Sequence, residues 1–76
     1  MNLDDFVSAF ADLFDETELS EFTPATRFRE LEEWSSLIGL ATMNMIAKKI
    51  GVQITAVELR GAQTIEDIYH LIQAKR

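Results

Sequence analysis

Two adjacent serines, Ser35 and Ser36, are the residues of this sequence whose type and position best suit chemistry. They stand where an acidic stretch gives way to an apolar segment with helical spacing, so one of them is expected to cap a helix by accepting a hydrogen bond from a free backbone N–H. The dipole and free N–H groups of a helix start also favour negative charge. A phosphodiester on Ser36 would be stabilised there, with its substituent in solvent. The residues alone are compatible with a modified serine and with a simple helix cap.

Other kinds of reactive site have little support in the composition. The chain contains no Cys, which excludes disulfides, a thiol nucleophile and thiolate metal ligands. A Gly-rich phosphate loop and a G-x-S-x-G elbow are both absent. The single histidine, His70, excludes a multi-histidine metal site and is expected on a solvated helix face beside Glu66 and Asp67. An enzyme using Ser36 with His70 is a disfavoured alternative, because the two lie on different helices and no acid is placed to orient the histidine.

Acidic residues near the end of the first helical segment are a possible but poor cation site. They lack the glycine and the spacing of a calcium loop, so we interpret them as a solvated edge. These residues are Asp12, Asp15, Glu16 and Glu18. We therefore predict no catalytic residue and no metal ligand in this chain.

Helical spacing and polar caps predict four helices that must position the serines. We expect helices over about 3–14 and 36–50, a short helix between Thr55 and Gly61, and a last helix from Thr64. Asn2 is the expected cap of the first helix, and Thr55 and Thr64 each begin a capping pair. The predicted fold is an all-α, four-helix bundle with three main helices and one short one.

A long connection, residues 15–35, joins the first two predicted helices. A structureless loop of that length is unusual in a small domain, so we expect Phe22, Phe28 and Leu31 to anchor it to the core. Thr23 and Pro24 predict a short helical turn within it, capped by Thr23.

The predicted helix over 36–50 has apolar residues on two faces. We place one set inward: Leu37, Leu40, Met43, Ile46, Ala47 and Ile50. We place the other set outward: Ile38, Ala41, Thr42, Met45, Lys48 and Lys49. Because Ile38 and Met45 are seven residues apart and share a side, they predict a docking face, unless the long connection covers them.

Charge is distributed unevenly along the chain. Residues 1–33 hold ten acids and two bases, whereas residues 34–76 hold three acids and five bases, for a net charge of -6. The acidic first half repels phosphate backbones, so we expect no nucleic-acid partner. It suits either docking on a basic protein surface or simple solubility.

Length and terminal sequence predict one small domain. The 76 residues allow a single domain, 1–76, which we expect to be monomeric. No apolar run approaches 18 residues, so no membrane span is predicted. The start MNLDDF carries acid where a signal peptide carries base, which favours a cytoplasmic protein.

The layout as a whole resembles the acyl carrier protein family, the phosphopantetheine-binding carrier domains. Their mark is an Asp-Ser-Leu-like triplet at the start of the second helix, and Ser35-Ser36-Leu37 occupies that place. The other matching features are Phe28 to Leu31 in the long connection, Ile54 after the second helix, the short helix capped by Thr55, and Thr64-Ile65-Glu66-Asp67 at the start of the last helix. The resemblance covers essentially the whole chain.

The resemblance implies a carrier without catalysis of its own. Ser36 matches the serine that receives 4'-phosphopantetheine from coenzyme A through a phosphopantetheinyl transferase. The arm's thiol then holds an acyl group as a thioester and presents it to acyl-loading and acyl-transfer enzymes, as in fatty-acid or polyketide synthesis. Expected partner-binding residues are Ser35, Leu37, Ile38, Ala41, Thr42 and Met45. The expected acyl pocket, between the second and third helices, comprises Leu40, Met43, Ile46, Ile54 and Leu59.

Two departures from the family pattern bear on the role of the chain. Ser35 replaces the usual Asp, which puts recognition by the transferase in question, and Lys48 and Lys49 stand where relatives carry acids. We therefore expect a dedicated carrier of a specialised pathway and poor performance in general fatty-acid synthesis. The alternatives are an unmodified carrier-like interaction module and an aminoacyl or peptidyl carrier.

Overall fold

Polar caps begin all four helices of the computed structural model, which describes residues 1–76. The helices are α1 (Leu3–Ala11), α2 (Ser36–Lys49), α3 (Ala56–Gly61) and α4 (Ile65–Lys75). Side chains of Asn2 and Ser35 cap α1 and α2, and Thr55 and Thr64 form full capping boxes at α3 and α4. These caps satisfy N–H groups that each helix start leaves free. The predicted small all-α bundle is confirmed.

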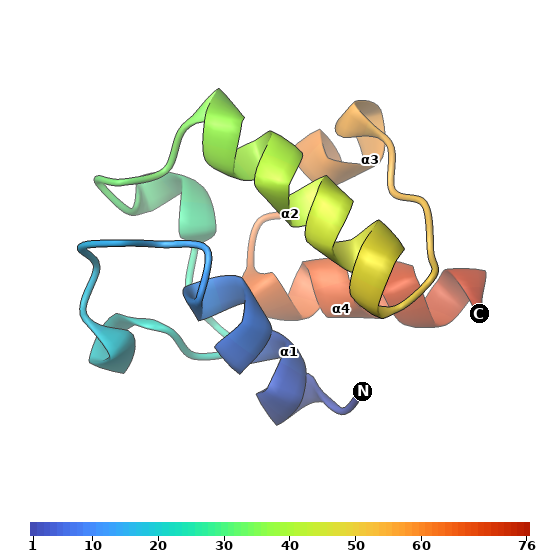
Figure 1. Ribbon diagram of the computed structural model, residues 1–76, viewed down its shortest axis with the longest axis horizontal. Helices are drawn as coiled ribbons and strands as arrows, with labels where there is room; N and C mark the ends of the chain where they lie inside the picture. Colours follow the sequence, from blue (N-terminus) through green and yellow to red (C-terminus); the bar gives the residue numbers. More distant parts are fainter.

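The four helices pack around a shared core rather than side by side in a row (Figure 1). Helix α2 crosses in front of α4, and α3 lies beside α2. Helix α1 packs against α4. None of the helices has both the length and the apolar character needed to cross a membrane.

Aromatic side chains join α1 to the long connection. The Phe10 ring is fully buried and lies 5.3 to 6.4 Å, between ring centroids, from five other aromatic rings. Those rings belong to Phe6, Phe14, Phe22, Phe28 and Trp34. The prediction that Phe22 and Phe28 anchor the connection is confirmed, and Leu31 packs against the same core. Such aromatic pairs contribute about 0.5–1.5 kcal/mol each beyond the area they bury.

The long connection is ordered by two 3₁₀ turns, η1 (Leu19–Glu21) and η2 (Phe28–Glu30). The predicted turn at Thr23 and Pro24 is present as a single tight turn, in which the Thr26 N–H donates to the Thr23 carbonyl at 3.0 Å, but the Thr23 side chain does not cap it. The Thr26 hydroxyl accepts from the Thr23 N–H and donates to the Glu21 carbonyl. These side-chain bonds compete with helical bonding.

The connection also closes the start of α4. The Ile65 N–H donates to the Thr26 carbonyl at 3.1 Å, and the Glu66 N–H donates to the Pro24 carbonyl at 2.9 Å. Two N–H groups of the first turn of α4 thus find backbone partners in a segment about 40 residues earlier in the chain. At the other end, α1 stops at Ala11 instead of the predicted Phe14, and a tighter turn carries Phe14 into the core.

The predicted orientation of α2 is wrong. Thr42 and Met45, placed outward from the sequence, are buried with 0% and 7% exposure. Leu37 and Leu40, placed inward, are 75% and 60% exposed. Ile38 is half-buried against the core, whereas Ile46 is fully buried as predicted.

Two residues explain which face of α2 is buried: Gly39, which has no side chain, and Thr42, whose hydroxyl is hydrogen-bonded. Gly39 has no side chain, so the Trp34 ring approaches the helix closely: a Cβ at Gly39 would lie 3.5 Å from Trp34 Cζ2. The buried Thr42 hydroxyl donates to the Ile38 carbonyl at 2.8 Å and so keeps a hydrogen bond. The face of α2 with Gly39, Thr42 and Met45 is therefore buried, although the hydrophobic pattern alone did not favour it.

Candidate functional site: the groove beside Ser36

The two serines have different environments at the start of α2. Ser35 is extended, and its hydroxyl accepts a hydrogen bond from the Ile38 N–H at 3.3 Å, which makes it the N-cap. Ser36 is the first helical residue, is exposed, and its hydroxyl has no hydrogen-bond partner within the protein. The cap function thus falls to Ser35 and leaves the hydroxyl of Ser36 available for chemistry.

An open groove of about 380 Å³ begins beside Ser36 and passes between α2 and α3. Five of its nine lining residues are apolar, and two are arginines. The lining residues are Arg29, Trp34, Ser36, Gly39, Leu40, Met43, Ala56, Leu59 and Arg60. The volume lies within the range of about 300–1,000 Å³ that is usual for small-molecule sites.

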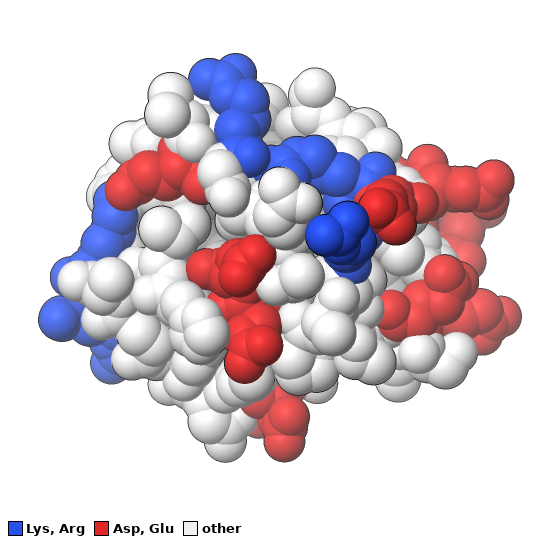
Figure 2. Space-filling model, turned by 180° about the vertical axis from the view of Figure 1, so that it is seen from behind, with Lys and Arg blue, Asp and Glu red and all other residues white.

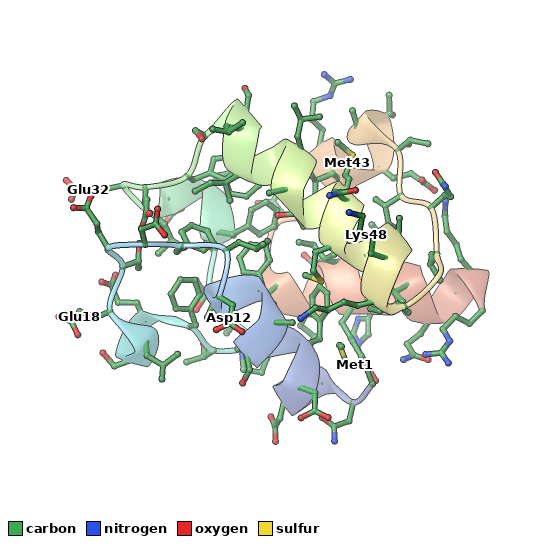
Figure 3. All side chains as sticks on the ribbon, in the orientation of Figure 1. Met1, Asp12, Glu18, Glu32, Met43 and Lys48 are labelled. Atoms are coloured by element: carbon green, nitrogen blue, oxygen red, sulfur yellow. The ribbon has the colours of Figure 1, made fainter.

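The groove brings together only part of the predicted acyl pocket. Leu40, Met43 and Leu59 line it, and Met43 lies on the side of α2 nearest α3 (Figure 3). Ile46 and Ile54 do not line it, because they are buried in the core with 0% and 6% exposure. Ile46 keeps its predicted inward place on α2, and Ile54 lies beyond the end of that helix, so both are core residues and not part of the groove.

Trp34 forms one wall of the groove and was not predicted as a site residue. Its ring packs edge-on against Phe28, with 4.9 Å between ring centroids, and lies over Gly39. A position directly before the two serines was the only sequence signal for it. These contacts place the ring as a wall beside Ser36.

Arg29 fastens the connection to α3 at the other side of the groove. Its Nη1 and Nη2 atoms donate to the carbonyls of Ala62 and Leu59, each at 2.6 Å, and its guanidinium lies 4.8 Å from the Phe28 ring centre. Both carbonyls lie at the end of α3, and the Leu59 carbonyl also accepts from the Ala62 N–H, so Arg29 adds a charge-assisted bond to each. Spacing in the sequence gave no indication of this contact, because its partners are about 30 residues away.

Arg60 is the second arginine of the groove, and it differs from Arg29 in its bonding. Its side chain makes no ion pair and no hydrogen bond within the protein, and the residue is exposed. Figure 2 shows Lys and Arg side chains along the upper part and at the left edge of one face, and acidic side chains at its right edge and in separate patches elsewhere on it.

Glu33 fixes the segment that leads into the serines. Its carboxylate accepts hydrogen bonds from the backbone N–H groups of Asp15, Glu16 and Thr17 at 2.6 to 3.0 Å, and from the Thr17 hydroxyl at 2.7 Å. The Thr17 hydroxyl makes the largest contribution to lowering the pKa of Glu33, and the backbone donors lower it further. Glu33 thereby ties residues 15–17, at the start of the long connection, to the segment just before Trp34.

The acidic edge lies on the outer side of the connection. Glu18 and Glu32 point away from the helices there (Figure 3). The predicted edge residues Asp12, Asp15 and Glu16 are likewise exposed. No group of three or more His, Asp or Glu side chains is arranged to hold a metal ion.

A second cavity, of about 460 Å³, lies between α3 and α4. Its two carboxylates already have structural partners: Glu58 bonds to Lys75 at 2.7 Å and caps α3, and Asp67 accepts from the Gln63 and Thr64 N–H groups. His70 is exposed on the polar face, as predicted, with Nε2 3.9 Å from Glu66. The groove beside Ser36 is therefore the stronger candidate site.

The predicted partner-binding residues do not form one surface. Ser35 and Leu37 are exposed and Ala41 is half-buried, so these remain accessible. Thr42 and Met45 are buried and offer no surface to a partner. Leu40, predicted for the pocket, lines the groove and also adds to the exposed apolar surface.

No family model matches this chain, and no curated protein or solved structure matches it significantly.

Proposed function

We propose that this protein is an acyl carrier protein that holds acyl intermediates as thioesters on a 4'-phosphopantetheine arm attached to Ser36. The observation that carries the proposal is the free, exposed hydroxyl of Ser36 at the mouth of the groove. The adjacent Ser35 already supplies the helix cap, so the second serine is not needed for that role. This division agrees with the family resemblance, in which the serine before Leu37 is the attachment point.

The residues around Ser36 suit such an arm. The phosphodiester would lie at a helix start and near Arg60, both of which favour negative charge. The arm supplies the thiol for a thioester, a group that the chain itself lacks. Leu40, Met43 and Leu59 offer an apolar lining for the acyl chain. The chain binds and shelters the cargo, while partner enzymes carry out the chemistry.

The exposed apolar residues beside the serine suit partner enzymes. Leu37 and Leu40 are close to the attachment point along α2 and largely exposed, and Lys48 and Lys49 make the far end of the helix basic. We propose a monomeric, cytoplasmic carrier that serves a phosphopantetheinyl transferase and the acyl-transfer enzymes of a specialised pathway. The basic end favours partners different from those of carriers whose recognition helix is acidic.

Intact mass after enzymatic loading tests the proposal. The purified protein is incubated with coenzyme A and a broad-specificity phosphopantetheinyl transferase, beside Ser36→Ala and Ser35→Ala variants. We expect one added phosphopantetheine in the wild type and in Ser35→Ala, and none in Ser36→Ala. Loss of the cap costs Ser35→Ala about 1 kcal/mol, so circular dichroism must first show that each variant is folded. No mass gain with several transferases would contradict the proposal.

A second candidate is a carrier-like interaction module that is never modified. Ser35 in place of the family's Asp and the exposed Leu37, Leu40 and Val57 favour it. Absence of loading in folded protein would support this role. An aminoacyl or peptidyl carrier would be loaded at the same serine, and it differs only in the cargo that the loading enzymes attach.

A further inference from the structure

Arg60 lies on the same groove as Ser36, and its charge has no partner inside the protein. An Arg side chain has five N–H donors arranged for planar anions such as phosphate and carboxylate. Arg29, the other arginine of the groove, already directs two donors to the carbonyls of Ala62 and Leu59. Arg60 is thus the groove arginine whose donors are all free to bind a ligand.

We infer that Arg60 is an anion-binding residue that holds the phosphodiester of the Ser36 arm against the mouth of the groove. This inference rests on the proposed function, because it requires an arm on Ser36. The groove is charged near its arginines and apolar along Leu40, Met43 and Leu59. This polarity matches a ligand with an anionic end and an aliphatic tail, which is the chemistry of an acyl group carried on a phosphodiester-linked arm.

Arg60 acts through position and not through a chemical step. Holding the phosphate fixes the first part of the arm. The arm then loses less conformational entropy when the acyl chain enters the groove. The chain then stays sheltered until a partner enzyme competes for the arm. An exposed contact of this kind contributes about 0.2–1 kcal/mol, which corresponds to a change of up to about fivefold in an equilibrium or a rate.

The test uses protein loaded with an octanoyl-phosphopantetheine arm, with loading verified by intact mass. Arg60→Gln removes the charge and keeps a polar side chain. Arg76→Gln is the matched control, because Arg76 is an exposed arginine at the end of the chain that does not line the groove. The measurements are the ³¹P resonance of the phosphodiester and the rate at which hydroxylamine cleaves the thioester.

We expect Arg60→Gln to shift the ³¹P resonance and to raise the cleavage rate by up to about fivefold, with Arg76→Gln close to the wild type. Identical spectra and rates in fully loaded Arg60→Gln and Arg76→Gln would overturn the assignment of Arg60 and leave the carrier function intact. Failure of Ser36 to load at all would overturn both.

Discussion

The orientation of α2 decides which residues line the groove, and two truncations on this helix test it. Met45→Ala removes a side chain that is 7% exposed, and Leu40→Ala removes one that is 60% exposed. The two residues are similar in size, lie on the same helix and are changed to the same residue. The hydrophobic pattern placed Leu40 inward and Met45 outward, so the two orientations predict opposite orders of destabilisation.

The expected magnitudes follow from burial. Complete burial of a Leu or Met side chain is worth about 1.5–3 kcal/mol, and a cavity adds to the loss, so Met45→Ala should cost about 2–4 kcal/mol. Leu40 keeps less than half of its surface buried, so Leu40→Ala should cost about 0.5–1 kcal/mol after the better helix propensity of Ala is included. A domain of this length has a total stability of about 4–11 kcal/mol, so Leu40→Ala should remain folded at room temperature, and Met45→Ala should remain folded when the total exceeds about 4 kcal/mol.

Urea unfolding followed by the fluorescence of Trp34 measures both losses. Trp34 is the single tryptophan of the chain and packs against the buried Phe28. The change in free energy of unfolding is read from the midpoint, provided that the denaturant dependence is unchanged. A larger loss for Leu40→Ala than for Met45→Ala would refute the orientation of α2 and with it the lining of the groove.

Three further predictions concern groups around the site. Gly39→Ala should raise the free energy of unfolding in urea by about 0.5–1 kcal/mol, because Gly weakens a helix interior and the added methyl group makes only ordinary contacts. Arg29→Gln should lower it by about 1.5–3 kcal/mol through the loss of two charge-assisted hydrogen bonds; an unchanged urea midpoint would show that these bonds contribute nothing. The pKa values of Glu33, Glu58 and Asp67 are lowered by hydrogen bonds that favour the charged carboxylates. Their contribution to stability is complete above the ordinary values of 4.5 for Glu and 3.8 for Asp, and is lost as pH falls through the lower values of the folded protein. Melting temperatures should therefore fall on acidification, less steeply in Glu33→Gln; equal slopes in the two proteins would contradict this role of Glu33.

The helix starts were predictable because their determinants are local. A cap needs a polar side chain and an N–H three residues later, so Asn2, Thr55 and Thr64 could be identified from the sequence, and the cap of α2 could be narrowed to Ser35 or Ser36. Each of the two capping boxes adds one acidic residue three positions after the cap, Glu58 or Asp67. Such short-range bonds do not depend on how the helices pack.

The face of α2 was not predictable in the same way. This helix carries large apolar residues all round, so periodicity offered two faces of similar quality. The choice depends on Trp34 packing over Gly39 and on the Thr42 hydroxyl finding the Ile38 carbonyl. The first is a contact with a residue outside the helix, and hydropathy counts Thr42 as polar although its hydroxyl is satisfied within the helix.

The charged part of the groove depends on contacts between distant segments. Arg29 and Arg60 are separated by the whole of α2, and they meet at one groove only because η2 packs against α3. The position of Ser36 at the start of α2 was predictable, because the apolar helical spacing begins there and a serine cap is a local feature.

Localisation of an attached phosphopantetheine to a single serine tests the central claim most directly. Trypsin cleavage after Arg29 and Lys48 releases one peptide that contains both Ser35 and Ser36. Electron-transfer fragmentation between the two serines then assigns the modification. The account predicts a single arm on Ser36 and none on Ser35. An arm on Ser35, or a folded protein that no transferase loads, would contradict it.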